Sequence, residues 1–503
     1  MSCDDILDVE PQGKLTFEQF WQSNEHAVAA IAGLYSYLGS TAHDLKTANM
    51  SATAISPVES YVYWGDLRGD LLAVNPGKYA ADQVNKENID NLNTAPGDVT
   101  TKFTQFYKII NQANQAIKYI PGIKSKDPAF TDEKELMGEA YFVRGFVYFW
   151  LARTFREVPL VLVPSESDVQ DYNQPKVTMD ALFDQIESDL ETAKTSLPVW
   201  YDNQVYSRCR ATRYTAMAVL ADVYLWRASL TNDAGVKSTY YDKVISNCND
   251  IIDSRKYVLI PGVNYGSIFT QGTSDETIFE SYANSLLNNQ RNNLRSWFTA
   301  TGFWLVPNNV DELFSYTTLA DYRSAVPPAG PVPEKGAVVS YSPSSRYIAK
   351  YSSNTNDARW IYYRYPEILL MKAEALAHRY EDHPDRLAEA ADLINTIRSR
   401  AYGISSYPKV MPSTTYEMDN AILDERAREL IGEGKRWFEL VRFATRDNFR
   451  HKELLVDRVL ASVSGVQQLT LAPRLVNQES WYLPLNADAL ASNPKLEQNP
   501  YYN

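Results

Sequence analysis

Apolar side chains recur three and four positions apart along most of this chain, the spacing of one face of an α-helix. In the first such stretch, Thr16 and Gln19 have the spacing of a capping box. A later stretch opens at Thr131 with acidic residues, which suit a helix N-terminus. The pattern predicts helices over residues 16–38, 101–120, 131–155, 178–196, 210–230, 238–254, 416–431 and 433–445, and a helix–turn–helix over 366–403.

Several of the predicted helices carry alanine at turn spacing. Ala218 and Ala221 lie in one of them, and Ala373 and Ala377 lie in another. Small side chains at this spacing let a partner helix approach closely. Helix pairs of this length resemble tetratricopeptide repeats, although the full repeat signature is absent. We therefore predict an all-α fold in which tetratricopeptide-like helix pairs form a scaffold.

Three long stretches, 40–100, 255–360 and 446–503, lack this periodicity. They are rich in Tyr, Trp, Asn, Ser, Gly and Pro, and loops of such length in a compact domain are usually functional. The last one ends in WYLPLNADALASNPKLEQNPYYN, which is too rich in Pro and Asn for a helix and too patterned for a random tail. The scaffold is therefore predicted to carry long irregular loops and minor short strands, and the ligand site is expected on those loops.

The composition narrows the class of function. The chain has 34 Tyr and 10 Trp, whose apolar rings and polar tips suit surfaces that stack on ligands and stay wet. With 49 basic and 62 acidic residues the net charge is −13, which argues against a nucleic-acid partner. No run approaches 18 apolar residues, so no transmembrane helix is expected.

The sequence shows no motif for catalysis or metal binding. It contains no GxSxG, no P-loop and no GxGxxG. His378 and His383 are five positions apart, which does not match a metal-binding HExxH helix face. We predict no catalytic residues, no metal ligands and no enzyme activity. A glycosidase pair among the 62 carboxylates stays open, because such a pair needs no sequence motif.

The three cysteines form no CxxC pair, so a zinc site is not expected. Cys209 and Cys248 lie in helical patterns and are predicted to be buried thiols. Cys3 follows Met-Ser and precedes Asp-Asp. It is either a disordered terminal thiol or the lipidated first residue of a mature lipoprotein, with residues 4–12 as a tether.

Two loops have the composition of a carbohydrate site. Sugars stack their apolar C–H faces on aromatic rings and bind Asn, Asp and Arg through their hydroxyl groups. Residues 61–77 and 281–309 combine these side chains. The alternative is that each aromatic ring only fixes its own loop to the scaffold. The candidate glycan-binding residues are Trp64, Arg68, Asp70, Tyr282, Asn288, Arg291, Trp297 and Trp304.

Five segments, in order along the chain, resemble the SusD/RagB family of outer-membrane glycan-binding lipoproteins. The departures are small: Arg156-Glu157 replaces a glycine-containing pair, and Glu439 stands where Asp is usual. The segments are CDDILDVEPQGKLTFEQFW from Cys3, KELMGEAYFVRGFVYFWLARTFREVPLVL (134–162), RYPEILLMKAEAL (364–376), DERARELIGEGKRWFELVRF (424–443) and the C-terminal sequence quoted above.

The resemblance implies four tetratricopeptide-like helix pairs and a loop-rich region that holds the ligand site. It also implies a tether over residues 1–15, an N-terminal region over 16–254 and a C-terminal region over 255–503, the two regions packing as one unit. Residues that match the family's blocks are interpreted as scaffold, through Arg–carboxylate pairs between helices and a packed tryptophan. They are Arg364, Glu374, Glu425, Glu433, Arg436 and Trp437.

The resemblance further implies capture of an oligosaccharide or polysaccharide at the cell surface, without catalysis. A lipid on Cys3 would anchor the chain to the outer membrane, and the partner would be a SusC-type TonB-dependent β-barrel transporter. No cofactor is expected. Family loops sometimes hold a structural Ca²⁺ ion, but no EF-hand spacing is present here. The alternatives are a peptide-binding family member and a secreted glycoside hydrolase, and the sequence names neither the glycan nor the transporter.

Overall fold

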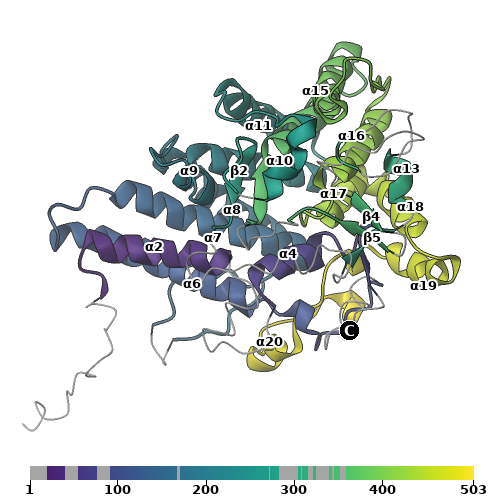
Figure 1. The fold of residues 1–503 in the computed structure, drawn as a ribbon. Coiled ribbons are helices and arrows are strands. Elements are labelled where there is room, and N and C mark those ends of the chain that lie inside the picture. The colour runs from purple at the N-terminus through teal and green to yellow at the C-terminus, as the bar shows by residue number, and fades with distance from the viewer. Residues whose placement is uncertain are drawn as a thin grey trace, which may run out of the picture.

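The structure of this chain is a computed structural model (Figure 1). It describes residues 20–39, 55–75, 91–166, 170–270, 272–282, 304–307, 309–314, 321–324, 339–342, 345–351 and 358–503. The fold is all-α, as predicted. The longer helices are α2 (Asn24–Leu38), α6 (Thr104–Tyr119), α7 (Glu133–Phe155), α8 (Met179–Ser196), α10 (Arg213–Leu230), α11 (Ala234–Asp253), α14 (Tyr365–Arg379), α15 (Pro384–Tyr402), α16 (Thr415–Leu430) and α17 (Arg436–Phe449).

Shorter helices fill the connections between these elements. The short α-helices are α4 (Pro57–Gly65), α9 (Tyr206–Cys209), α13 (Val310–Phe314), α18 (Glu453–Ala461), α19 (Gly465–Leu475) and α20 (Ala487–Ser492). The 3-10 turns are η2 (Val99–Thr101), η3 (Ile120–Ser125), η4 (Gly262–Phe269), η5 (Gln478–Trp481) and η6 (Pro500–Tyr502).

Consecutive long helices pack against each other: α7 with α8, α10 with α11, α14 with α15, and α16 with α17. The starts of these helices follow local rules. The Thr178 side chain accepts a hydrogen bond from the Ala181 N–H at the start of α8, as an N-cap should. Helix α11 also packs against α14, so the helices before and after residue 254 are in contact. The assignment of the pairs to the tetratricopeptide class stays a prediction.

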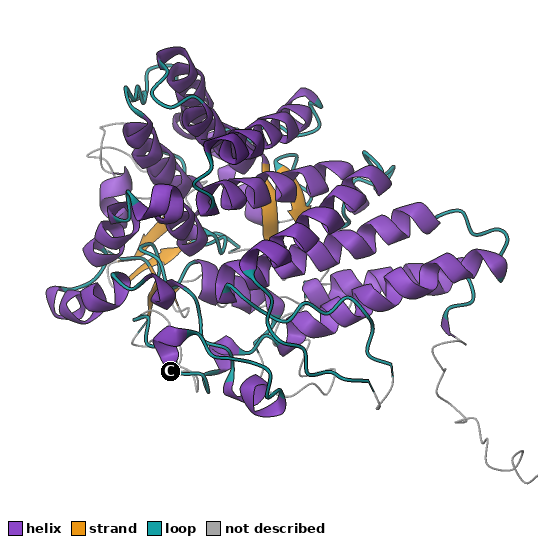
Figure 2. Ribbon diagram, turned by 180° about the vertical axis from the view of Figure 1, so that it is seen from behind, coloured by secondary structure: helices purple, strands orange, loops and turns teal. Residues whose placement is uncertain are grey.

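The described strands are short and form three two-stranded antiparallel ladders among the helices (Figure 2). Strand β1 (Ala73–Val74) pairs with β3 (Trp304–Leu305), and β2 (Thr277–Glu280) pairs with β6 (Ile361–Arg364). Strand β4 (Val339–Ser342) pairs with β5 (Ser345–Ile348) as a hairpin. Both paired segments of β2 and β6 are fully buried, so this ladder is part of the core.

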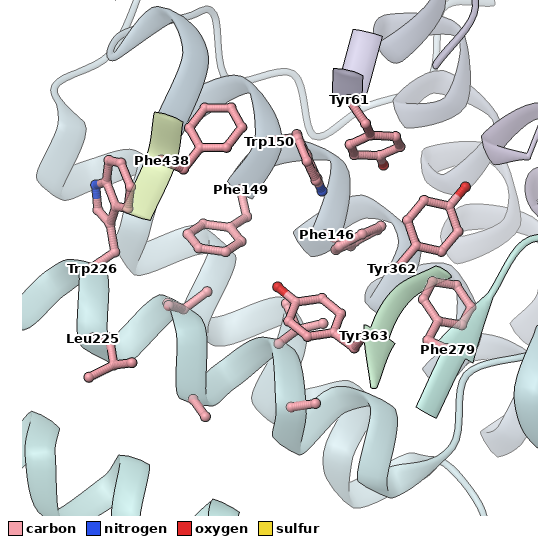
Figure 3. Packing of buried hydrophobic residues seen from close by; sticks show 14 of the residues in the cluster. Tyr61, Phe146, Phe149, Trp150, Leu225, Trp226, Phe279, Tyr362, Tyr363 and Phe438 are labelled. Atoms are coloured by element: carbon pink, nitrogen blue, oxygen red, sulfur yellow. The ribbon is translucent and has the colours of Figure 1, made fainter. Parts of the chain in front are cut away.

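Aromatic rings dominate the core between α7, α10, α17 and the β2–β6 ladder (Figure 3). Phe146 lies edge-on to Tyr362 at 5.5 Å, and Trp150 lies edge-on to Phe438 at 5.3 Å. Edge-to-face pairs of this kind add about 0.5–1.5 kcal/mol each beyond the area that they bury. Because the rings come from both halves of the sequence, this core joins the two halves.

Three of these predictions are wrong in extent. Residues 40–100 and 446–503 were expected to be irregular, yet they contain α4, α18, α19 and α20. The helix expected over 16–38 is interrupted before α2, where residues 21–23 form bends; Thr16 and Gln19 lie outside the described residues. No helix within the described ranges is long and apolar enough to cross a membrane.

The C-terminal segment lies across the helices. The Leu483 N–H donates to the Thr154 carbonyl at 2.8 Å, and the Ala487 N–H donates to the Pro96 carbonyl at 2.8 Å. The indole N–H of buried Trp437 donates to the Trp481 carbonyl at 3.0 Å. The segment is therefore tied to three separate parts of the scaffold through its backbone.

Candidate functional site

The tertiary structure brings together the two segments that were predicted to bind a ligand. Strand β1 lies in residues 61–77 and strand β3 lies in 281–309, and they pair with Ala73 opposite Leu305. Just before β1, the ring of Tyr63 packs edge-on against Trp304 at 5.5 Å. Just after β3, the Asn309 side chain donates to the Asp70 carbonyl at 3.1 Å. We call this place the β1–β3 junction, and it is the candidate ligand-binding face.

Trp64 does not lie on a loop, which corrects the sequence prediction. It lies in α4, which begins with a capping box: the Ser56 Oγ accepts from the Glu59 N–H, and the Glu59 carboxylate accepts from the Ser56 N–H. Pro57 occupies the first helical position, where its missing N–H costs nothing. The S-P-V-E spacing is visible in the sequence and could have revealed this helix.

The side chain of Trp64 is fully buried. Its ring stacks on Phe106 at 4.9 Å and meets Phe155 edge-on at 5.3 Å. Its indole N–H donates to the Thr100 carbonyl at 2.7 Å. A ligand on the surface cannot reach this ring, so we no longer count Trp64 as a candidate binding residue. Its contacts instead fix α4 to the scaffold.

Arg68 is also buried, against the expectation that it contacts the ligand. Its guanidinium donates to the Trp481 and Ser480 carbonyls at 2.7 and 2.6 Å. The same group lies 4.5 Å from the centre of the Trp437 ring. Burial lowers the pKa of Arg68 to about 10, because the site supplies neutral carbonyls and rings rather than a paired carboxylate. Arg68 therefore holds the C-terminal segment in place.

Asp70 is likewise buried and forms a bidentate ion pair with Arg436, at 2.6 and 2.8 Å. Burial alone would raise the pKa of Asp70, but Arg436 holds it below its ordinary value. The Asp70 carboxylate is thus bound to Arg436 at the N-terminus of α17. The backbone carbonyl of Asp70 accepts the hydrogen bond from Asn309 at the β1–β3 junction. The Asp70 side chain is therefore a support for the junction, not a ligand contact.

Of the remaining predicted residues, the structure describes Trp304 and Tyr282. Trp304 is buried within the junction, packed on Tyr63, and so shapes the face from below. Tyr282 is exposed and lies beside α9, because Arg359 contacts both its ring, at 5.1 Å, and the Cys209 sulfur, at 3.4 Å. Asn288, Arg291 and Trp297 lie outside the described residues, as does Cys3.

A cluster of charged side chains is buried between β6, α15, α16 and the residues around Arg323 and Lys350. Arg323 pairs with Glu425 at 2.6 Å, and Lys350 pairs with Glu433 at 2.6 Å. Arg364 lies in the middle, 2.9 Å from Glu433. Burial alone would lower the pKa of Arg364, but the surrounding carboxylates hold it well above its ordinary value. We call this the central charge cluster; its members are Glu276, Asp321, Arg323, Lys350, Arg364, Arg400, Glu425, Glu429 and Glu433.

The residues that match the family's blocks have the scaffold role predicted for them. Glu374 pairs with Arg442 at 2.8 Å, linking α14 to α17. Arg364, Glu425 and Glu433 belong to the central charge cluster, and Trp437 is buried. The two thiols predicted to be buried, Cys209 and Cys248, are buried and free.

The described part of the site shows no metal-binding geometry. Within the described ranges, no three His, Cys, Asp or Glu side chains are grouped so that they could hold a metal ion. What the junction offers instead is a rigid floor made of packed rings and paired charges. Most of its buried charged side chains are paired with one another or with backbone carbonyls.

Two family models match the chain. The model described as the SusD family matches residues 275–502, and the model described as starch-binding associating with outer membrane matches residues 48–225. Together they cover both halves of the sequence. The chain therefore belongs to the SusD/RagB family, as the five sequence segments indicated.

Individual relatives agree with this assignment. Two SusD-like proteins of Formosa agariphila are 27% and 25% identical to this chain; they match 100% of it, over 96% and 97% of their own lengths. A SusD superfamily protein of Bacteroides thetaiotaomicron has a TM-score of 0.70 at 20% identity, covering 96% of this chain and 99% of its own. A putative sugar binding protein of Bacteroides vulgatus has a TM-score of 0.71 at 19% identity, with 96% and 99% covered. The solved structures establish the shared fold.

Proposed function

We propose that this protein captures an oligosaccharide or polysaccharide at the cell surface and delivers it to a TonB-dependent β-barrel transporter of the SusC type. The observation that carries the proposal is the β1–β3 junction. Two segments about 230 residues apart pair there, and the second of them, residues 281–309, is rich in aromatic, amide and guanidinium groups. The family model for residues 48–225 is described as starch-binding associating with outer membrane, which supports the same reading.

The proposed mechanism is capture without bond cleavage. Aromatic rings stack on the sugar's C–H faces, and amide and guanidinium groups bind its hydroxyls. Asn288, Arg291 and Trp297 remain the proposed ligand contacts by their chemistry. The lipid anchor on Cys3 holds the chain at the outer membrane, where it can pass its ligand to the transporter. Dissociation constants between mM and μM would suit transfer, because a tightly held ligand leaves slowly.

The test is affinity electrophoresis and calorimetry of the purified chain against amylopectin, a β-glucan, a mannan, a galactan, a uronan and a sulfated galactan. Binding to one class without release of reducing sugar is the expected result. Release of reducing sugar would favour the glycoside hydrolase alternative. Binding of peptides but of no polysaccharide would favour the peptide-binding alternative.

The position of the site has its own test. Trp297→Ala should weaken binding of the polysaccharide that the chain retains, by about 1 kcal/mol or more, by analogy with stacking of bases on aromatic rings. The melting temperature of the variant should match that of the unsubstituted chain. Unchanged affinity would remove residues 281–309 from the proposed site.

A further inference from the structure

A second surface with saccharide-binding chemistry lies at the start of α9 and in the turn before it. Residues 200–206, between α8 and α9, read Trp-Tyr-Asp-Asn-Gln-Val-Tyr. Tyr206 is 50% exposed, and the polar side chains of residues 202–204 are exposed beside it. Trp200 and Tyr201 are half-buried at the same place. We call residues 200–206 the stacking segment.

The tyrosine rings of the stacking segment share one cationic support. The Arg210 Cζ atom lies 4.6 Å from the centre of the Tyr201 ring and 5.5 Å from that of the Tyr206 ring. The two rings are therefore separated by no more than the sum of these distances. Arg210 is itself fixed by ion pairs to Glu135, at 3.0 Å, and to buried Glu139.

The backbone of the segment is fixed as well. The Tyr201 N–H donates to the Ser207 Oγ at 2.9 Å, and this hydroxyl donates back to the Tyr201 carbonyl at 3.0 Å. The Tyr201 hydroxyl donates to the Ala211 carbonyl at 3.1 Å. These bonds close residues 201–207 into a compact turn, so little conformational entropy remains to be lost when a ligand binds.

Trp200 adds a third ring, held from two sides. The Arg208 guanidinium lies 4.7 Å from its centre, and the ring of buried Tyr257 meets it edge-on at 5.9 Å. Arg208 is buried, so it supports the indole from the protein interior. Lys256, which is exposed, lies 5.2 Å from the same indole. With Asp202 exposed nearby and exposed Asp275 beside Arg208, the surface carries charges of both signs.

We propose that the stacking segment is a second saccharide-binding surface for a neutral glycan chain, an inference that rests on the proposed function. Three rings fixed by guanidinium groups offer stacking faces, and Asp202, Asn203 and Gln204 offer hydrogen bonds to hydroxyl groups. Figure 1 places α9 on the left of the molecule and β4 and β5 to the right of its centre, and β5 contacts β3 of the junction. A long glycan, or two chains, can therefore occupy the protein at two places.

The test uses the polysaccharide that the chain retains in the panel above. Tyr206→Ala should raise the dissociation constant at least about fivefold, because a stack is lost. Tyr206→Phe keeps the ring and should change it less than about twofold. Tyr172→Ala is the matched control, since Tyr172 is 48% exposed and lies outside the stacking segment. All three substitutions are at exposed positions, and their melting temperatures should match.

The outcomes separate the two proposals. A loss of affinity in Tyr206→Ala, with Tyr206→Phe and Tyr172→Ala unchanged, supports the second surface. Equal affinity in Tyr206→Ala overturns it and leaves the proposed function in place. Failure of the unsubstituted chain to retain any of the six polysaccharides overturns both.

Discussion

Trp64, Arg68 and Asp70 illustrate how one residue type serves two purposes. Aromatic rings, guanidinium groups and carboxylates bind sugars, but they also bind one another and backbone carbonyls. In this chain the Arg68 guanidinium donates to backbone carbonyls of the C-terminal segment, and the Asp70 carboxylate pairs with Arg436 of α17. Residue chemistry alone cannot distinguish the two uses, because the distinction is burial, and burial depends on neighbours that are hundreds of residues away.

Asp66 gives a prediction at the same scale. Its buried carboxylate accepts backbone N–H groups of Gly434, Lys435 and Arg436 at 2.7, 3.0 and 3.2 Å. Burial nevertheless raises the pKa of Asp66 to about 7. The folded state then binds a proton that the unfolded state releases near pH 4, so this group's contribution to stability decreases as pH rises from about 4 to 7.

The measurement is the melting temperature of the unsubstituted chain and of Asp66→Asn between pH 5 and 8. The amide cannot ionise. The melting temperature of the variant should therefore rise relative to that of the unsubstituted chain as the pH rises from 5 to about 7. A difference between the two proteins that stays constant over this range would show that Asp66 does not titrate there.

At the scale of elements, α4 decides the architecture of the candidate site. Its last residue, Gly65, lies against the turn before α17, where an added Cβ atom would come within 1.8 Å of the Gly434 carbonyl oxygen. Only glycine permits this approach of two backbones. The contact sets the direction in which the chain leaves α4 for β1.

Gly65→Ala should therefore lower the free energy of unfolding by about 1–3 kcal/mol or more, since the turn must shift. Gly33→Ala is the matched control: Gly33 lies in α2, and an added Cβ there meets no atom within 4 Å. That substitution should stabilise by about 1 kcal/mol, through helix propensity. Urea unfolding measures both, and equal effects of the same sign would contradict the role given to Gly65.

At the scale of the whole molecule, the central charge cluster ties the loop-rich part of the chain to the C-terminal helices. Arg364 on β6 contacts carboxylates from the segment before β2, from α16 and from the turn that follows it. Removing one member of a buried ionic group leaves its partners uncompensated in a medium of low dielectric constant. Loss of one member of the cluster should therefore destabilise the whole cluster.

Arg364→Met should cost about 3–5 kcal/mol of unfolding free energy, because Glu276, Glu429 and Glu433 lose their shared cation. The control is Arg386→Met, which removes an exposed pair with Glu389 and should cost less than about 1 kcal/mol. Denaturant unfolding of the two variants gives the comparison. Similar losses in both would mean that the cluster adds little to stability.

The sequence by itself determined most of the long helices, the cap at Thr178 and the family. Helical periodicity and caps such as Thr178 are local, so they are readable over a window of a few residues. The start of α4 was also readable, from the capping box of Ser56 and Glu59. The burial of Cys209 and Cys248 followed from their helical setting.

Only the tertiary structure decided which of the candidate residues are buried. The pairing of β1 with β3, the burial of Trp64 under Phe106 and the contact of Arg68 with the Trp481 carbonyl join segments far apart in the chain. Such contacts depend on how several helices pack, and no short window of sequence contains that information. The sequence marked two segments that pair in the structure, and packing showed that Trp64, Arg68 and Asp70 of the first segment are buried.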